Sequence, residues 1–327
     1  MKAVSVFSGG LDSMLACQIV RAQGIEVLAF FFKTPFFGPK RALESASAIQ
    51  VPIRVVDITE RHLQVVKAPK YGWGEHMNPC IDCHALMFRI AGEMLHQVGA
   101  HFIITGEVLG QRPMSQNRRA LALVAKESGF EGLVLRPLSA KLLPETIPER
   151  QGWVRRELLL DFQGRSRKPQ MELAKRLGIS DYPSPAGGCL LTEEVFSRRL
   201  KDLLDSKVDL PAVRELELLK VGRHFRLTST VKAIVGRNKN ENKAIQTLRG
   251  QEDILLHPVS VPGPAVLLTG DPMGMGEDEV AMGALLVAAY SDAETGSELA
   301  VRVKKNGEEE LISLKAPDKA DFKDLMI

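Results

Sequence analysis

A short glycine-containing loop near the N-terminus has the composition of a phosphate-binding site. Residues 8–13 read SGGLDS and separate an apolar run at residues 3–7 from a helical pattern that starts at Leu11. Paired glycines let backbone N–H groups approach an anion, and the N-terminus of the next helix adds unpaired donors and partial positive charge. An ionised Asp12 cannot donate a hydrogen bond, so beside a polyphosphate we expect it to act through Mg²⁺. The residues expected to bind the phosphates are Ser8, Gly9, Gly10, Leu11, Asp12 and Ser13.

This loop differs from the Walker P-loop. It lacks the GxxxxGK[ST] pattern, so transfer of a γ-phosphoryl group is not the chemistry expected. Its place between a strand and a helix supports phosphate binding, because that arrangement aims backbone donors at a ligand. The alternative is a glycine turn that caps a helix and binds nothing.

Three of the four cysteines are spaced in ways that suit metal or sulfur chemistry. Cys80 and Cys83 form a CxxC in NPCIDC, and Cys189 follows two glycines in PAGGC. Three thiolates match a 4Fe–4S cluster with one open iron, or a Zn²⁺ site with water as the fourth ligand. A third interpretation is a thiol relay without metal, with Cys80 or Cys83 as nucleophile and Cys189 as resolving thiol. The simplest alternative is unrelated buried thiols, the role expected for Cys17 in the first helix.

The composition is that of an ordinary protein with a packed core. The chain has 327 residues, of which 45% are hydrophobic and 25% charged, and its net charge is +3. This length suggests about two domains. No apolar run approaches the roughly 18 residues of a membrane span, and the N-terminus lacks the features of a signal peptide. We therefore expect a cytoplasmic protein without membrane contact, where structural disulfides are rare.

The elements that must position these residues alternate between strands and helices. Apolar runs typical of buried parallel strands occur at residues 3–7, 27–32, 51–56 and 101–105. Helical patterns occur at residues 11–20, 85–98, 155–162, 170–177 and 195–204. The alternation predicts an α/β domain over residues 1–205, with a mostly parallel sheet and helices on both faces.

The remaining residues, 206–327, have a different charge pattern. Between Arg214 and Arg249 there are nine basic and three acidic residues, so this segment carries a net charge of +6. Strand-like runs at residues 265–269 and 299–303 indicate a smaller α+β domain. A basic segment of this kind predicts a face that binds nucleic acid, although a solvated basic surface is the alternative.

Several separated motifs resemble one enzyme family when taken in order. SGGLDS resembles the PP-loop of ATP-pyrophosphatases, and NPCIDC, TGEVLGQRPMSQ at residues 105–116 and LRPLSA at residues 135–140 resemble the catalytic domain of ThiI-type 4-thiouridine synthetases. NPCxxC and the glycine-flanked Cys189 are also similar to 2-thiouridylases. The THUMP and rhodanese domains found in ThiI-type proteins are not expected in this chain.

The resemblance implies roles for particular residues. ATP would be cleaved between its α- and β-phosphates, with Asp12, Cys80, Cys83 and Cys189 as the catalytic residues and the three cysteines as the metal ligands. Four further residues, Phe31, Phe32, Thr105 and Gly106, match positions that flank the nucleotide in that family.

The C-terminal segment resembles the RNA-binding domain of NFACT proteins. The resemblance rests on GRNKNEN at residues 236–242, close to that domain's GRN signature. It implies contacts with tRNA, for which the candidate residues are Arg223, Arg226, Lys232, Arg237, Asn238, Lys239 and Lys243.

The two resemblances together imply an ATP-dependent tRNA sulfurtransferase. A uridine carbonyl oxygen would be adenylated with release of pyrophosphate and then replaced by sulfur, most simply giving 4-thiouridine through a 4Fe–4S cluster. The alternatives are 2-thiouridine or 2-thiocytidine synthesis by a persulfide relay, and a non-enzymatic RNA-binding adaptor. The partners implied are tRNA and a sulfur donor, either sulfide or a cysteine desulfurase, and a homodimer is left open.

Overall fold

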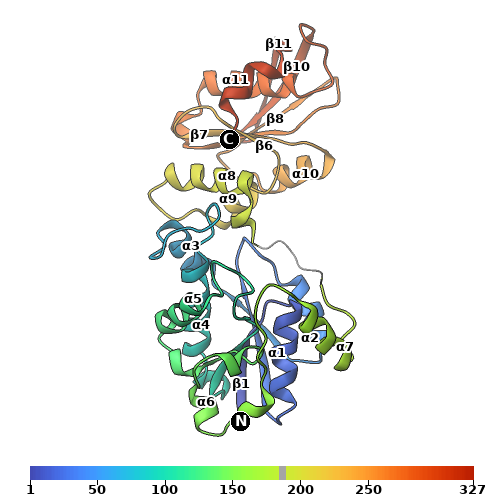
Figure 1. Ribbon diagram of the computed structural model, residues 1–327. Coiled ribbons are helices and arrows are strands. Elements are labelled where there is room, and N and C mark those ends of the chain that lie inside the picture. The colour runs from blue at the N-terminus through green and yellow to red at the C-terminus, as the bar shows by residue number, and fades with distance from the viewer. Residues whose placement is uncertain (184–188) are drawn as a thin grey trace. The chain divides into compact units, whose positions relative to one another are not determined.

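A parallel sheet of five strands organises the first part of the chain in the computed structural model, which describes residues 1–183 and 189–327 (Figure 1). Its order is β3-β2-β1-β4-β5, and each neighbouring pair is parallel. The bounds are Lys2–Val6 for β1, Glu26–Lys33 for β2, Ile53–Asp57 for β3, Phe102–Thr105 for β4 and Val134–Leu135 for β5. Strand order reverses beside β1, and in open α/β sheets ligands bind at the carboxyl ends of strands at such a point.

Helices cover both faces of this sheet, as the sequence predicts. The helices are α1 (Leu11–Arg21), α2 (Lys40–Ala48), α3 (Thr59–Lys67), α4 (Cys80–Glu93), α5 (Arg118–Ser128), α6 (Ile147–Arg150) and α7 (Lys168–Arg176). On one face, Cys17 of α1 and Ala42 of α2 pack with Phe31. On the other face, Phe88 of α4 and Val124 of α5 belong to a separate hydrophobic cluster. Burial on both faces explains why these strands are continuous apolar runs.

The second part of the chain is built on an antiparallel sheet. Its six strands have the order β11-β10-β8-β9-β7-β6. The bounds are Arg223–Arg226 for β6, Val231–Val235 for β7, Ile254–Pro258 for β8, Val266–Gly270 for β9, Glu298–Lys305 for β10 and Glu308–Lys315 for β11. The helices are α8 (Glu194–Asp205), α9 (Val213–Leu218), α10 (Lys239–Thr247) and α11 (Glu277–Ala289). The α+β class expected for this part is therefore confirmed.

The two compact units divide between Thr192 and Glu193, whereas the sequence analysis places the boundary after residue 205. The two boundaries differ because α8 belongs to the second unit, to which it is hydrogen-bonded through a buried arginine. Both terminal nitrogens of the Arg199 guanidinium donate hydrogen bonds of 2.9 Å, one to Leu219 O and one to Gly222 O. A buried guanidinium needs such partners, so α8 is held by the segment that follows it.

One predicted helix is wrong. Residues 155–162 form only a short 3-10 turn at Arg156–Leu158. The following backbone is extended instead, because Leu160 N donates to Pro137 O at 2.9 Å and Phe162 N donates to Leu138 O at 2.8 Å. These hydrogen bonds to distant residues satisfy backbone N–H groups that would otherwise bond within a helix.

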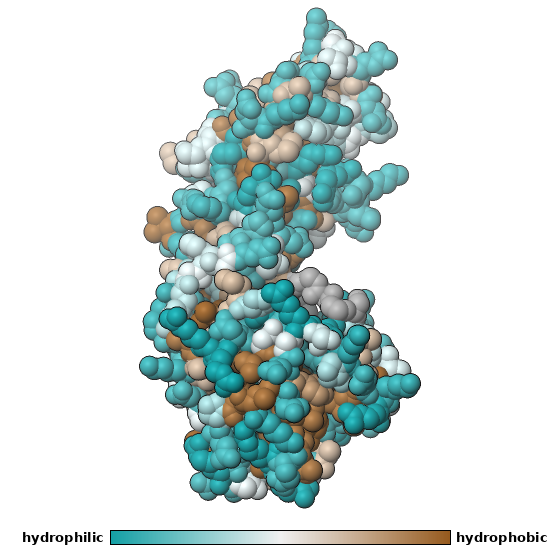
Figure 2. All heavy atoms as spheres, in the orientation of Figure 1, coloured by the Kyte–Doolittle hydropathy of each residue, from teal (hydrophilic) through white to brown (hydrophobic). Residues whose placement is uncertain are grey.

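Most of the drawn face of the molecule is hydrophilic. Figure 2 shows hydrophilic residues across both units, with hydrophobic residues gathered in patches on the N-terminal unit. Within residues 1–183 and 189–327, no helix combines the length and apolar character that crossing a bilayer would require.

Candidate active site and nucleic-acid interface

The glycine loop is packed so closely that two of its contacts exclude any larger residue. Gly9 has a φ of +77°, and a Cβ there would lie 2.7 Å from Ala42 Cα. On the other side, a Cβ on Gly106 would lie 2.5 Å from Ser13 N. Gly106 directly follows β4, so the loop is held between α2 and the end of that strand. Ser45 Oγ adds a hydrogen bond of 2.7 Å to Gly9 O.

The N-terminus of α1 presents backbone donors without a side-chain cap. Gly10 is the N-cap residue, and no side chain there accepts a hydrogen bond from the first turn. Ser13 Oγ donates to Gly10 O at 2.7 Å, whereas Ser8 Oγ accepts from Gly10 N at 3.3 Å. The hydroxyl hydrogen of Ser13 is therefore donated within the loop, whereas the hydroxyl hydrogen of Ser8 takes no part in the bond with Gly10 N. An uncapped helix N-terminus behind a glycine turn suits an anion such as a phosphate.

Asp12 is half-buried, and one of its carboxylate oxygens is unsatisfied. Its Oδ2 accepts a hydrogen bond of 2.7 Å from Gln111 Nε2, but Oδ1 is buried and has no partner among the described residues. Burial raises the pKa of Asp12, although the Gln111 hydrogen bond and the charges of Arg167 and Arg112 oppose that shift. A buried acceptor without a donor is costly. A carboxylate oxygen left open beside a phosphate cradle is the kind of ligand that Mg²⁺ accepts.

The CxxC cysteines lie at the start of α4. Cys80 is the first residue of this helix, and Cys83 is buried one turn later, with Sγ 3.2 Å from His62 Nε2. The pKa of Cys83 is raised well above its usual value, first by burial and then by the charges of Cys189 and Cys80. Cys189 thus lies within electrostatic reach of Cys83, although far away in sequence.

The thiols nevertheless do not form a finished metal site. Among the described residues, no three His, Cys, Asp or Glu side chains are arranged to hold a metal ion. Cys189 follows residues 184–188, which lie outside the described residues and include the glycine pair noted in the sequence. Soft thiolates are the donors preferred by Fe–S clusters and Zn²⁺, so the residue types fit either group. The metal ligands therefore stay a prediction.

Arg112 connects the glycine loop with the cysteines. Its positive charge opposes the rise in the pKa of the Asp12 carboxyl, and it also opposes the rise that burial causes in the pKa of Cys80. The phosphate loop and the CxxC therefore lie within electrostatic reach of the same guanidinium. Arg112 and Gln111 lie within the motif at residues 105–116, but the sequence analysis did not single them out.

A buried ion network holds the cysteine helix against the end of β4. Glu107 Oε1 lies 2.8 Å from His84 Nδ1, and Glu107 Oε2 accepts from Arg136 Nε at 2.9 Å. Burial alone would raise the pKa of Glu107, but the charge of Arg136 and the His84 hydrogen bond lower it overall. His84 directly follows Cys83, and Glu107 directly follows Gly106. The network therefore fixes the cysteines relative to the phosphate loop.

The two phenylalanines expected beside the nucleotide point to different faces of the sheet. Phe31 belongs to the hydrophobic cluster of α1 and α2, and Phe32 to that of α4. Adjacent strand residues alternate in this way, so one ligand cannot meet both side chains on the same face. Both are buried, as is Thr105 at the end of β4.

The predicted RNA-binding residues fall into two groups. Around the start of α10, Lys239 and Lys243 are exposed, Arg237 pairs with Glu241, and Asn238 caps the helix by accepting from Glu241 N at 3.0 Å. The second group lies on the strands. There Arg223 sits 5.1 Å from the Tyr290 ring centroid, Arg226 pairs with Asp202, and Lys232 is buried.

Two family models match separate parts of the chain. Residues 1–141 match the family described as "Thiamine biosynthesis protein (ThiI)", and residues 222–325 match the "NFACT protein RNA binding domain". A "Probable tRNA sulfurtransferase" of Staphylococcus aureus is 30% identical over 121 residues, which cover 34% of this chain and 28% of that protein. The chain thus matches less than a third of the length of such relatives.

Solved structures similar to parts of the chain include a 4-thiouridine synthetase–RNA complex with bound ATP. It is 24% identical with a TM-score of 0.38, and the match covers 54% of this chain and 41% of that one. The C-terminal part of a fibronectin/fibrinogen-binding protein from Streptococcus suis is 14% identical with a TM-score of 0.28, covering 50% of this chain and 79% of that one.

Proposed function

We propose that this chain, which joins a ThiI-like PP-loop domain to an NFACT-like RNA-binding domain, is an ATP-dependent tRNA sulfurtransferase. The observation that carries the proposal is the contact of 2.8 Å between Glu107 and His84, which joins the residue after Gly106, packed on the phosphate loop, to the residue after Cys83 of the CxxC. An ATP-cleaving ligase that forms amides would have no use for thiols beside its phosphate loop. Sulfur transfer onto an adenylated base needs both in one place.

The loop residues would hold the pyrophosphate part of ATP. The backbone N–H groups at the start of α1, which have no side-chain cap at Gly10, would face the bound anion, and Gly9 and Gly106 would keep the loop in the shape that this needs. Asp12 Oδ1 would hold Mg²⁺, which supplies positive charge against the phosphates. Arg112 and Arg167 would add further positive charge near the same carboxylate.

The reaction proceeds by two displacements. A carbonyl oxygen of the tRNA base attacks the α-phosphorus of ATP, the bond between the α- and β-phosphates breaks, and pyrophosphate leaves. The base oxygen is now bonded to AMP, a much better leaving group than oxide. A sulfur nucleophile then attacks the ring carbon that carries this oxygen, and AMP departs with the oxygen. The uridine product we propose is 4-thiouridine.

Cys80, Cys83 and Cys189 would hold a 4Fe–4S cluster in this proposal. When bound, such a cluster supplies an open iron at which a sulfur atom can be presented. The electrostatic effect of Cys189 on Cys83 supports the proximity that this ligand set requires. The second candidate is a relay of persulfide sulfur through the same thiols, which would need no metal and could yield a 2-thio base.

Asp12 offers the most direct test of the ATP chemistry. In an assay that measures pyrophosphate and AMP formed from ATP in the presence of tRNA, we expect Asp12→Asn to reduce turnover at least 100-fold. Asparagine keeps the size of the side chain and can still bond with Gln111, so the loss would reflect the missing charge. Glu44→Ala, an exposed change on α2, is the matched control. Undiminished turnover by Asp12→Asn would contradict the proposed role.

The sulfur chemistry needs a separate measurement. Protein purified without oxygen should contain iron and absorb visible light through thiolate-to-iron charge transfer, and Cys189→Ala should lose both properties. Iron-free protein that still thiolates tRNA would exclude the cluster and favour the relay. Mass analysis of the nucleosides in treated tRNA identifies the product, and absence of any thiolated base would leave the RNA-binding adaptor as the better interpretation.

A further inference from the structure

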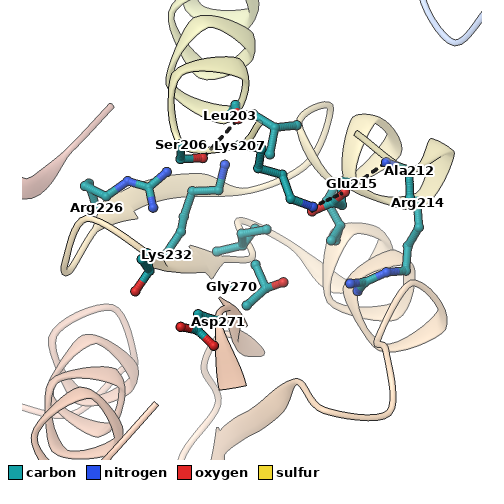
Figure 3. A pocket seen from close by; sticks show the side chains of 14 residues that line it. Leu203, Ser206, Lys207, Ala212, Arg214, Glu215, Arg226, Lys232, Gly270 and Asp271 are labelled. Atoms are coloured by element: carbon teal, nitrogen blue, oxygen red, sulfur yellow. Dashed lines mark hydrogen bonds and ion pairs between the residues drawn. The ribbon is translucent and has the colours of Figure 1, made fainter. Parts of the chain in front are cut away.

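The C-terminal unit contains a cavity to which no ligand has been assigned above, although two of the predicted RNA-binding residues line it. Its volume is about 400 Å³, and it lies between α8, α9 and the strands β6, β7 and β9 (Figure 3). Leu203, Leu218 and Ile234 form apolar parts of its wall, whereas Arg226 and Lys232 line it with positive charge. Cavities of a few hundred Å³ with an apolar wall and a few polar groups are typical of small-ligand sites.

Lys232 is the unusual residue of this cavity. Its side chain is only 7% exposed, and among the described residues Nζ has an ion pair with Asp202 but no hydrogen bond. The nearest carboxylate oxygen, Asp202 Oδ2, is 3.5 Å away and already accepts a bond of 2.5 Å from Arg226. Buried ammonium groups are normally hydrogen-bonded, because an unpaired buried charge destabilises the folded state.

The group formed by Arg226, Lys232 and Asp202 carries one excess positive charge, and Arg199 adds a further positive charge near Lys232. Arg226 and Lys232 lie opposite each other on β6 and β7 and share the single carboxylate of Asp202. Arg226 uses both oxygens of Asp202, through Nε at 2.9 Å and a terminal nitrogen at 2.5 Å. Lys232 is therefore left to face the cavity, and a monoanion such as a phosphate group would balance the charge.

The other side of the cavity suits a nucleobase. Arg214 is fixed there by Asp253 at 2.5 Å, so its planar guanidinium is held in place. Bases that leave a helical stack often lie on such planes. Asp271 accepts one bond, from Met273 N to Oδ1 at 3.1 Å, and its second oxygen can accept from a base N–H group. The Lys207–Glu215 ion pair and the apolar residues that line the cavity would contact the sugar and the face of the base.

We infer that this cavity binds one nucleoside monophosphate unit, with its phosphate at Lys232 and its base toward Arg214. The inference rests on the proposed RNA-binding function, because the expected source of that unit is a nucleotide of bound RNA turned out of its stack. A free mononucleotide offers the same chemistry, and the experiment below separates the two sources.

Part of the cavity wall lies outside the two segments that match family models. The match to the NFACT domain begins at residue 222 and the ThiI match ends at residue 141. The residues from α8 and α9 that close the cavity lie between these two segments, and α8 is bonded to the second unit through Arg199. The cavity therefore depends on a helical pair outside both matched segments.

The test measures phosphate recognition in the full chain without any turnover. UMP and uridine are titrated against the wild-type protein and Lys232→Met, which keeps the length of the side chain but removes its charge. We expect the wild type to bind UMP about tenfold more tightly than uridine, and Lys232→Met to lose this preference. Lys315→Met, a change of an exposed lysine on β11 that is not among the predicted RNA-binding residues, should keep it. Equal affinities of the wild type for UMP and uridine would overturn the inference.

A second arm identifies the source of the nucleotide. If the unit comes from RNA, tRNA should compete with UMP, and Lys232→Met should weaken tRNA binding more than Lys315→Met does. If UMP binds through Lys232 but tRNA does not compete, the cavity takes free nucleotides, and the RNA part of the inference is wrong. Because neither arm requires sulfur transfer, a failed thiolation assay would leave these results intact.

Discussion

Arg112 shows how a single side chain can couple two kinds of chemistry. Its positive charge acts on Asp12 of the phosphate loop and on the Cys80 thiol. A polyphosphate bound at the loop would compete with Cys80 for the charge of Arg112. The attraction between opposite charges falls with distance, and a positive charge that gains a second partner attracts the first one less. The occupied and empty states of the loop should therefore differ in how strongly the thiolate of Cys80 is stabilised.

Lys232 allows a prediction about stability at the residue scale. Burial, with the charges of Arg226 and Arg199, lowers its pKa from 10.5 to about 8, and Asp202 only partly opposes this. A lysine whose pKa is lower in the folded state destabilises the fold while it is charged in both states. The penalty is full below about pH 8, shrinks as pH rises, and is gone above the unfolded pKa of 10.5.

Lys232→Met should therefore be more stable than the wild type near neutral pH. The charge-dependent part of the difference is up to about 3 kcal/mol. Urea unfolding at about pH 7 and about pH 10 measures it, and the advantage of the variant should shrink at the higher pH. A difference that does not change with pH would show that Lys232 is not desolvated. Such a cost in stability is expected of a residue kept for binding.

At the scale of elements, the end of β4 acts as the support of the phosphate loop. Gly106→Ala should weaken ATP binding at least tenfold, because its Cβ would lie 2.5 Å from Asp12 C and Ser13 N, and the backbone of the loop would have to move. Gly38→Ala is the matched control, since a Cβ there meets nothing within 4 Å. Titration with ATP measures the effect. Equal affinities of the two variants would mean that contact with β4 does not shape the loop.

Some elements could be predicted from the local sequence. Others could not, because their structure is set by hydrogen bonds to distant residues. The buried strands β1 and β2 are continuous apolar runs, and their prediction needed only the local sequence. The two-residue strand β5 has too few residues to leave a pattern. The turn at Arg156–Leu158 reads as a helix because its extended continuation is set by backbone bonds to Pro137 and Leu138, which no local pattern reveals.

The same reasoning applies to the candidate sites. The glycine loop was predictable because its function depends on residues adjacent in sequence. Arg112 was not, because its effect on Cys80 depends on how the segment after β4 folds back. Lys232 was predicted to belong to a basic face, but the whole of β7 is buried between β6 and β9. A lysine within the apolar run VKAIV was the available signal of its burial.

At the scale of the whole molecule, the proposed enzyme needs its RNA-binding domain for substrate and not for ATP chemistry. Binding of tRNA through exposed lysines should depend strongly on salt, because each phosphate contact releases a counterion. The double variant Lys239→Ala/Lys243→Ala removes two exposed charges on α10. We expect the slope of log affinity against log salt to decrease by about 1.4 to 1.8, since each lost contact changes it by roughly 0.7–0.9.

The same variant should leave the ATP chemistry intact. Any slow formation of AMP from ATP without tRNA should match that of the wild type, whereas the tRNA-stimulated rate at low tRNA concentration should fall. The two charges are far along the chain from the glycine loop, and the α10 residues around them are held by the Asn238 cap and the Arg237–Glu241 pair. An unchanged salt slope would show that tRNA does not contact this helix. The cavity at Lys232 would then be the next candidate for the tRNA-binding site.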